Sequence, residues 1–212
     1  MNCCQCQGIE ELFSQQYVTR EVRRYRAKGP DKTTRMLVDA IKAEEVTGGT
    51  LLDIGGGVGA IQHALLQAGL EHATDVDVSS AYLAAARSEA HRRGFLDRVT
   101  YHQGNFVDLV SEIEPADIVT LDRVICCYPD MEDLVGKSAA RAGKLYGLVY
   151  PRDTWWIRIG LAVGNFFFKL RRSAYRGFIH PTREVEAILH SSGLRRRFYR
   201  RTLLWQVAVY AR

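Results

Sequence analysis

The stretch LLDIGGGVGAIQHALLQAGL, residues 51–70, sets four glycines between a short apolar run and a helical pattern. The first run includes Asp53, and the glycines that follow are Gly55, Gly57 and Gly59, with Gly56 as a fourth. A Cβ atom at such a turn would block the approach of a ligand and would disfavour a positive φ. Glycines after a buried strand therefore indicate a loop whose backbone amides lie close to a bound cofactor.

Polar residues also end the next three apolar runs. Asp77 ends HATDVD, 22 residues after Gly55, where a carboxylate can accept both hydroxyls of an adenosine ribose. The third run leads into HQGNFVDL, where Asn105 can meet an adenine amino group and Phe106 can lie against the base. The fourth leads into VTLDRVICCYPD and brings Asp122 to the same rim. In open α/β sheets, ligands bind at this carboxyl edge of the strands.

The order of elements predicts a doubly wound α/β sheet. Apolar runs at 50–54, 73–78, 99–102, 117–121 and 144–150 alternate with helical patterns at 59–68, 80–93 and 131–142. This alternation is typical of a parallel sheet covered by helices on both faces. Two helices, 10–27 and 32–46, are expected before the sheet. A helix from Pro181 to about Gly193 and an antiparallel strand pair, 195–202 and 203–210, are expected after it.

Four segments together resemble the successive motifs of class I S-adenosylmethionine-dependent methyltransferases. They are LLDIGGGVG, VDVSSAYLAAAR, HQGNF and ADIVTLDRV, and the resemblance covers residues 50–150. It implies a Rossmann-like, seven-stranded, mostly parallel sheet with an antiparallel last strand, and S-adenosylmethionine as the cofactor. It also implies roles for the residues. Asp53, Gly55, Gly57 and Gly59 hold the methionine end, Asp77 holds the ribose, Val78 and Phe106 flank the adenine, Asn105 reads its amino group, and Asp122 lies on the same rim.

A narrower resemblance concerns LDRVICCYP, which is similar to the corresponding segment of the magnesium-protoporphyrin O-methyltransferases. A histidine precedes the Tyr-Pro pair in that family, whereas Cys127 stands at that position here. The segment therefore marks a relative of that family and does not assign its substrate to this chain.

The composition indicates one ordinary globular domain. The chain has 212 residues, 47% of them hydrophobic and 25% charged, and no internal repeat. Within the single domain, 1–212, we expect an N-terminal helical cap (1–47), a cofactor-binding core (48–150), a helical lid insertion (151–180) and a final helix with a strand pair (181–212). The N-terminus MNCCQCQGIEELF lacks the pattern of a signal peptide, so we expect a cytoplasmic protein with reduced thiols.

The positive charge gathers in the last third of the chain. Between residues 152 and 201 there are twelve Lys/Arg against three Asp/Glu, so this part carries +9 and the remainder −4 of the net +5. One alternative function is therefore a basic-faced binding or regulatory module, recruited by RNA or membrane, that retains the cofactor pocket. In the segment RRRFYRR, however, strand alternation would divide the charges between two faces. Nucleic acid is accordingly not our expected partner.

The methyl acceptor should be held by elements outside the core sheet. The segment 155–168 is apolar nearly all round but too short to span a bilayer. Three interpretations stay open: a lid over the acceptor, which we favour, a homodimer contact, or an interfacial helix anchored on lipid by Lys169, Arg171 and Arg172. The predicted function is methylation, at oxygen, of a small apolar or aromatic molecule.

The candidate catalytic residues are Tyr128, Cys127, His180 and Tyr25, because phenols and alcohols need a base or an orienting group near neutral pH.

The cysteines leave a further alternative open. Cys3, Cys4 and Cys6 crowd the N-terminus, while Cys126 and Cys127 lie at the predicted rim. If the N-terminal segment folds over the rim, thiolates from both groups could bind a metal or metalloid, and the enzyme could methylate a thiol or metalloid. Packed thiols explain the same residues, and we predict no resident metal.

Overall fold

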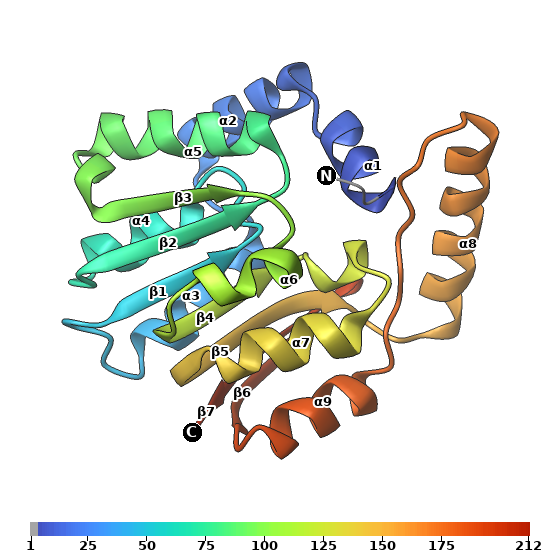
Figure 1. Cartoon of the computed structure of the whole chain (residues 1–212). Coiled ribbons are helices and arrows are strands. Elements are labelled where there is room, and N and C mark those ends of the chain that lie inside the picture. Colours follow the sequence, from blue (N-terminus) through green and yellow to red (C-terminus); the bar gives the residue numbers. More distant parts are fainter. Residues whose placement is uncertain (1–3) are drawn as a thin grey trace.

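The computed structural model describes residues 4–212 and contains a seven-stranded sheet in the order β3-β2-β1-β4-β5-β7-β6 (Figure 1). The strands are β1 (Thr50–Ile54), β2 (His72–Asp77), β3 (Val99–Gln103), β4 (Ala116–Asp122), β5 (Ala142–Pro151), β6 (Arg195–Arg201) and β7 (Trp205–Ala211). The strand β7 lies antiparallel between β5 and β6, while β1 to β5 pair in parallel. The predicted fold class, including the antiparallel last strand, is confirmed.

The described chain also contains α-helices, most of which flank this sheet. They are α1 (Cys4–Leu12), α2 (Gln15–Lys28), α3 (Lys32–Lys42), α4 (Ala60–Gln67), α5 (Ser80–Arg93), α6 (Phe106–Leu109), α7 (Met131–Ala140), α8 (Trp155–Leu170) and α9 (Thr182–Ser191). The prediction of a single helix over 10–27 is wrong, because one helix ends at Leu12 and the next begins at Gln15. Ser14 has an extended ψ of 158° at the start of α2, and serine favours this helix-start position.

Alternation along the strands divides the core into two layers. In β1, Leu51 packs with side chains of α3 and α4, whereas Leu52 packs with those of α7 and α9. Successive side chains of a strand point to opposite faces, so short apolar runs such as β1 serve both layers. The result is a sheet covered on both sides, with its carboxyl edge left for a ligand.

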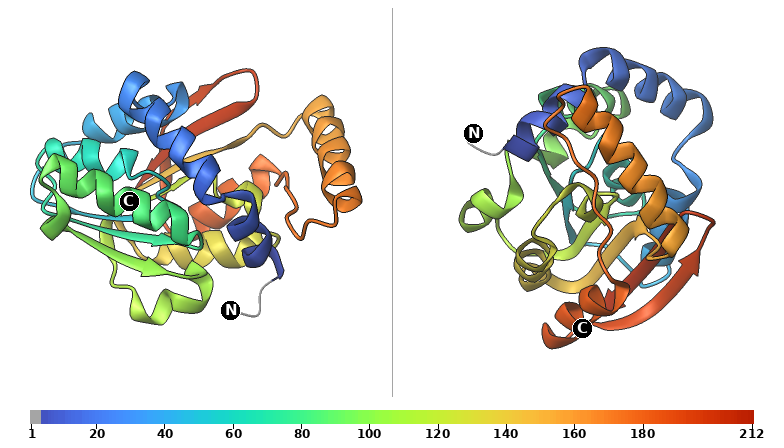
Figure 2. Two further views of the ribbon diagram at one scale, coloured as in Figure 1. Left: turned by 90° about the horizontal axis from the view of Figure 1, so that it is seen from above. Right: turned by 90° about the vertical axis from the view of Figure 1, so that its right-hand side faces the viewer.

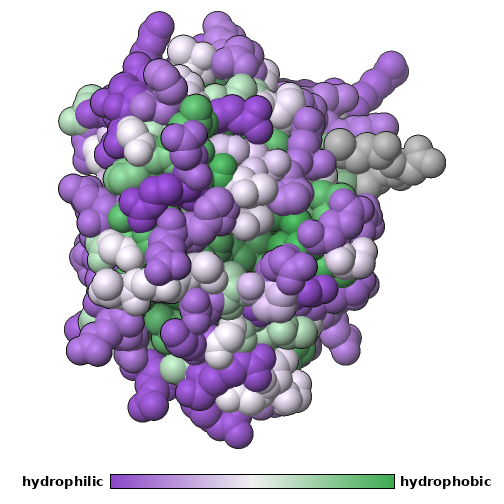
Figure 3. Space-filling model, turned by 60° about the vertical axis from the view of Figure 1, so that its left-hand side comes forward, coloured by the Kyte–Doolittle hydropathy of each residue, from purple (hydrophilic) through white to green (hydrophobic). Residues whose placement is uncertain are grey.

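Helix α1 and the start of α2 lie at this carboxyl edge, α3 packs against the sheet, and α8 stands apart from the sheet (Figures 1 and 2). No residue of α8 is fully buried. On the side drawn in Figure 3, polar residues dominate the surface and hydrophobic ones lie mostly in recesses between them. Among the helices of residues 4–212, none has both the length and the apolar character needed to cross a membrane.

Candidate active site

The glycine turn after β1 has the backbone that its sequence predicts. Gly55, Gly57 and Gly59 have φ values of 67°, 58° and 78°, in the left-handed region that favours glycine. A Cβ atom on Gly55 would lie 2.5 Å from Cγ2 of Val124, so the turn is also closely packed. Gly55 and Gly57 line a cavity at the carboxyl edge, whereas Gly59 begins α4 outside its lining.

Gly56, the fourth glycine, is required for a different reason. Its Cβ would lie 2.3 Å from Nε2 of Gln62, 2.6 Å from Oδ1 of Asp75 and 2.9 Å from Oδ2 of Asp53. The turn therefore closes over a buried polar cluster that leaves no room for a side chain. Local sequence spacing gives no sign of this constraint, because the three partners come from β1, α4 and β2.

Asp53 lies at the floor of the cavity with its carboxylate held in place. Its Oδ1 accepts a hydrogen bond from Thr120 Oγ1 at 2.7 Å, and its Oδ2 accepts one from Gln62 Nε2 at 3.2 Å. Burial raises the pKa of Asp53 to about 7. Neighbouring Asp75 is fully buried, and its pKa is raised well above the ordinary value by burial and then by the charges of Asp53 and Asp77.

Asp77 is oriented by two backbone amides. Gly57 N–H donates to Oδ2 at 3.3 Å and Ser79 N–H donates to Oδ1 at 2.8 Å. Each oxygen keeps a further lone pair for a ligand in the cavity that Asp77 lines. Burial raises the pKa of Asp77 to about 6. The cap of α5 is Ser79, whose Oγ accepts from Tyr82 N–H at 3.3 Å, so Asp77 is free of that structural task.

The residues predicted for the adenine line the same cavity: Val78, Asn105 and Phe106. Asn105 caps α6, since its Oδ1 accepts from Val107 N–H at 3.3 Å. Its Nδ2 donates to the hydroxyl of Tyr128 at 3.2 Å, which fixes the amide orientation. The remaining lone pair on Oδ1 is the acceptor that an exocyclic amine requires.

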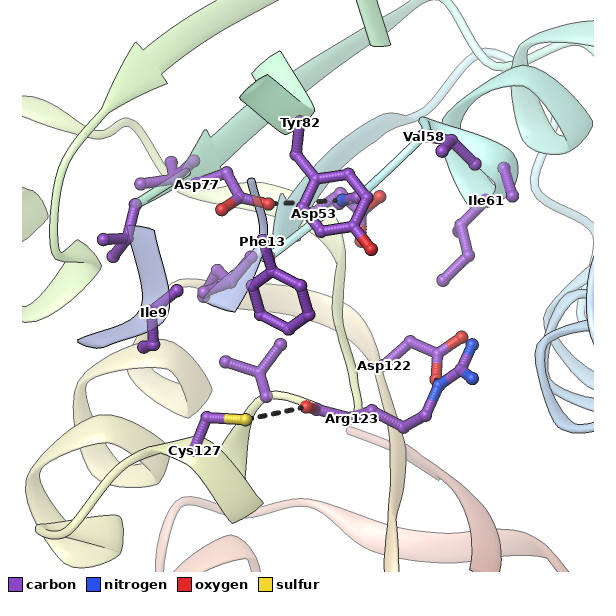
Figure 4. Close-up of a pocket in the computed structure, with 18 of the residues that line it drawn as sticks. Ile9, Phe13, Asp53, Val58, Ile61, Asp77, Tyr82, Asp122, Arg123 and Cys127 are labelled. Carbon is purple, nitrogen blue, oxygen red and sulfur yellow. Dashed lines mark hydrogen bonds and ion pairs between the residues drawn. The ribbon is translucent and has the colours of Figure 1, made fainter. Parts of the chain in front are cut away.

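The opposite wall of the cavity comes from helices that the sequence motifs do not mark. Ile9, Phe13 and Tyr17 of the α1–α2 segment line it, and Figure 4 shows Phe13 pointing into the space between Asp77 and Cys127. The ring of Phe13 packs against Tyr17 and Tyr82, with centroids 5.5 and 5.1 Å apart. These aromatic residues were missed, because only the tertiary placement of α1 and α2 brings them to the rim.

A paired charge network completes this wall. Arg123, which has a left-handed φ of 63°, contacts Asp122 at 3.0 Å and Asp31 at 2.8 Å. Asp31 also pairs with Arg24 at 2.5 Å, and Asp122 accepts from Thr34 Oγ1 at 2.5 Å. The two guanidiniums are thus matched by carboxylates within the wall, as Figure 4 shows for Asp122 and Arg123. Asp122 and Arg123 both belong to the segment VTLDRVICCYPD that was expected at this rim, but only Asp122 was predicted to bind the cofactor.

The cavity also brings three of the four catalytic candidates together. Tyr128, Cys127 and Tyr25 line it. Tyr25 is buried beside His63, with its hydroxyl 3.4 Å from His63 Nδ1, and burial raises its pKa. His180 does not line the cavity. Its Nε2 lies 2.9 Å from the carbonyl oxygen of Ile125 and 3.0 Å from that of Tyr128, so His180 contacts the turn 125–128 from outside the cavity lining.

Cys126 and Cys127 form a vicinal thiol pair on the cavity wall. Their Sγ atoms are 3.9 Å apart, and Cys127 Sγ lies 3.3 Å from the hydroxyl of Tyr175. The hydrogen bond between the two thiols raises the pKa of Cys126 and lowers that of Cys127. The helix α1 does fold over this turn, because Gln5 Nε2 donates to the carbonyl of Cys127 at 2.9 Å.

The metal alternative finds no cluster in the part of the chain that the structure describes. Cys6 is buried, whereas Cys3 and the side chain of Cys4 lie outside the described residues. Among the described side chains, no group of three His, Cys, Asp or Glu is placed to hold a metal ion. The lid interpretation of 155–168 stays a prediction: among the described residues, Tyr175 of the predicted insertion lines the cavity together with residues of α1 and α2, whereas no residue of α8 does.

The cavity has a volume of about 420 Å³, within the range of small-molecule sites. Three groups line this one cavity: the glycine turn with positive φ, the oriented carboxylate of Asp77, and the side-chain amide of Asn105, which caps α6. These residues fit S-adenosylmethionine, which has an amino-acid end, a ribose with two hydroxyls and an adenine amine.

Comparisons with known proteins agree with this geometry. Residues 52–150 match the family described as methyltransferase domain. The ribosomal protein L11 methyltransferase of Photorhabdus laumondii is 29% identical over 117 residues, which are 52% of this chain and 40% of that protein. Three such curated relatives are covered over only 40 to 53% of their length.

Solved structures are similar over nearly the whole chain. The magnesium protoporphyrin IX methyltransferase of Synechocystis PCC 6803 with bound SAH has a TM-score of 0.73 and 18% identity, covering 96% of this chain and 98% of that one. An O-methyltransferase family 2 protein of Planctomyces limnophilus in complex with apigenin has a TM-score of 0.69 and 19% identity, covering 94% and 62%. At these identities the likeness establishes the fold.

Proposed function

Because residues 52–150 match the methyltransferase domain family and the chain has the class I S-adenosylmethionine-dependent methyltransferase fold, we propose that it methylates a small, uncharged aromatic or apolar molecule at oxygen. The observation that carries the proposal is the continuity of one cavity. One half of it has the glycine turn, Asp77 and Asn105, and the other half has the aromatic wall of α1 and α2. A donor and an acceptor can therefore meet in it.

In the donor half, the protein binds and orients. S-adenosylmethionine supplies a methyl group on a sulfonium, which an acceptor displaces in line. Asp77 would accept the two ribose hydroxyls, while the turn from Gly55 to Gly57 and Asp53 would hold the methionine end. Val78 and Phe106 would flank the adenine, and Asn105 Oδ1 would accept from its amine. Such positioning is the main source of rate in a displacement of this kind.

In the acceptor half, the protein supplies an apolar surface and excludes water. Phe13, Tyr17 and Tyr82 offer ring faces and edges to a flat acceptor. The carboxylates of Asp31 and Asp122 already pair with Arg123, and Asp31 also pairs with Arg24. Among the described residues that line this wall, there is consequently no unpaired guanidinium for an anionic acceptor, which favours a phenol or another neutral hydroxyl over a carboxylate.

A neutral hydroxyl needs a group that takes or orients its proton. Tyr128 follows β4 and lines the cavity, and its hydroxyl accepts from Asn105 Nδ2, so an oxygen lone pair is directed by a fixed amide. Cys127 is the second candidate, because its pKa is lowered. Tyr25 has a raised pKa and serves better as a hydrogen-bond donor.

The test is transfer of a radiolabelled methyl group to a panel of acceptors. The panel holds planar phenols, with apigenin as one probe, aromatic carboxylates, thiols and a ribosomal protein fraction, and Asp77→Ala is the negative control. We expect label in a neutral aromatic hydroxyl with the wild type and none with Asp77→Ala. Transfer to carboxylates alone, or to protein alone, would refute the proposed acceptor class.

A second candidate function is methylation of a thiophilic acceptor. It is favoured by one observation, the two thiols of Cys126 and Cys127 on the cavity wall. In the same assay, trivalent inorganic arsenic serves as the probe, and the double variant Cys126→Ser/Cys127→Ser as the control. Label in arsenic that this variant loses would favour the second candidate over the first.

A further inference from the structure

The helix α8 carries a stripe of large apolar side chains that the described chain leaves exposed. Five of them recur at intervals of four, four, three and four residues, which places them on one face of a helix. We call this face the outer stripe. Its members, each at least half exposed, are Trp155, Ile159, Val163, Phe166 and Leu170.

The other side of α8 packs against the strap that follows it, residues 171–180. A Cβ on Gly177 would lie 2.7 Å from Cδ1 of Leu161, so the strap after α8 packs tightly there. Asn165 bonds both polar groups of Gly177, at 2.8 and 2.9 Å, and Phe168 packs edge-on against Tyr175 at 5.1 Å. These contacts hold the helix in one rotation, and Figure 2 shows it standing at the side of the molecule.

Positive charge lies at the end of the outer stripe. Lys169, Arg171 and Arg172 are exposed, and no ion pair to any of them is found in the described chain. Arg158, in contrast, is neutralised by Asp153 at 2.6 Å. Cations without an ion-pair partner beside an apolar stripe that contains a tryptophan and a phenylalanine are typical of helices that lie in a membrane interface.

A second apolar feature lies beside the start of α8. Leu203 and Leu204, at the β6–β7 turn, are 73% and 48% exposed. The backbone N–H of Arg152 donates to the carbonyl of Leu204 at 2.9 Å, so this turn lies against the segment that leads into Trp155. The next residue, Trp205, lines the cavity. Exposed apolar side chains therefore lie both on α8 and at a turn beside the segment that leads into it, next in sequence to a residue that lines the cavity.

We infer that the outer stripe docks on an anionic lipid bilayer, with α8 lying in the plane of the interface. The stripe supplies apolar insertion, and Lys169, Arg171 and Arg172 supply attraction to acidic headgroups. A second copy of this chain is the competing occupant, but it carries the same uncompensated cations, so it offers no charge complement. An acidic lipid surface offers that complement.

Docking of α8 on lipid also indicates where the methyl acceptor enters, and this step rests on the proposed function. Tyr175 packs on Phe168 of α8 and also lines the cavity, and Trp205 lies between the exposed leucines and the cavity. Docking of α8 would bring this part of the cavity wall close to the lipid. The acceptor is then a lipophilic hydroxyl compound that enters from the membrane.

The test is cosedimentation of the full chain with vesicles of phosphatidylcholine alone and of equimolar phosphatidylcholine and phosphatidylglycerol. We expect binding to the anionic vesicles that weakens with added salt. The triple variant Lys169→Gln/Arg171→Gln/Arg172→Gln should bind them about 100-fold more weakly. Trp155→Ser/Phe166→Ser should lose a similar factor, about 100-fold, through lost insertion.

The matched control is Arg20→Gln/Arg23→Gln/Lys28→Gln, which removes the same charges from exposed positions on α2. It should bind like the wild type. Equal loss in control and test variants, or no binding by the wild type, would overturn the inference. The inference would also be overturned if three results occur together: sedimentation velocity shows a dimer without vesicles, Trp155→Ser/Phe166→Ser dissociates that dimer, and vesicle binding is absent.

Calorimetry with S-adenosylhomocysteine is read separately for each variant. It keeps the docking inference and the proposed function distinguishable, because a chain that binds vesicles but not this ligand refutes only the function.

Discussion

The carboxylate of Asp77 should make donor binding depend on pH in a way that one substitution removes. Burial raises its pKa to about 6 in the empty cavity, and the ribose hydroxyls require its ionised form. At pH 5 about one molecule in eleven is ionised, so the apparent affinity for S-adenosylhomocysteine should be about tenfold weaker than at pH 7. Asp77→Asn should flatten this component of the pH profile.

The same variant should also weaken binding at pH 7. Hydrogen bonds to a charged acceptor contribute about 1.5 to 3 kcal/mol, which corresponds to a loss of about 10- to 150-fold for Asp77→Asn. The assay is calorimetric titration at a series of pH values from 5 to 7. Asp53 titrates in this window too, so the informative quantity is the difference between the two profiles.

Asp97→Asn is the matched control, because Asp97 is an exposed aspartate in a turn before β3 and outside the cavity lining. It should leave both the affinity and the pH profile unchanged. An Asp77→Asn profile parallel to that of the wild type, or an affinity within twofold of it at pH 7, would refute the reasoning.

Three other predictions concern the turn, the buried cluster and the rate. Gly55→Ala should abolish donor binding in calorimetry and lower the melting temperature, because a left-handed φ costs alanine about 1 to 2 kcal/mol and the added Cβ overlaps Val124. The control Gly160→Ala, on exposed α8, should do neither, and equal melting curves for the two variants would contradict this prediction. The melting temperature of Asp75→Asn should rise relative to that of the wild type between pH 5 and pH 8. The buried carboxyl of Asp75 has a raised pKa, so the wild type loses stability over this range, whereas the amide does not titrate; a difference that shrinks with pH would contradict this. Tyr128→Phe should lower kcat about 100-fold or more with an identified neutral acceptor while KM changes little, and an unaltered kcat would remove Tyr128 as the proton-accepting group.

The core of the fold could be predicted from sequence because its signals are local. These signals are the strand alternation, the glycines after Asp53 and the acidic residue Asp77. Each of them can be read from a few neighbouring residues in the sequence. Helix α5 has the predicted bounds for the same reason, since Ser79 caps it and Gly94, with φ of 76°, ends it. In such segments the local preference and the tertiary structure agree.

The rest of the site could not be predicted because it depends on distant contacts. The apolar pattern continues from Phe13 to Tyr17 across Ser14, so periodicity predicted one helix where the break turns Phe13 towards the cavity. His180 looked like a base by residue type, but its ring is engaged by two carbonyl groups of the Ile125–Tyr128 turn. The left-handed φ of Arg123 has no signature in its residue type.

The basic edge strand β6 was predicted to divide its charges by simple alternation. A register irregularity between Arg196 and Phe198 interrupts that alternation. Arg196 stacks over the ring of Tyr199 at 4.9 Å and also pairs with Glu186, so part of this charge is engaged within the protein. Whether nucleic acid binds this strand stays a prediction.

The most direct test of the account is a crystal structure of the chain grown with S-adenosylhomocysteine. We predict that the ribose hydroxyls lie on the carboxylate of Asp77, the amino-acid end against the Gly55–Gly57 turn, and the adenine between Val78 and Phe106. Ligand density elsewhere on the protein, or an unchanged cavity at saturating ligand, would contradict it.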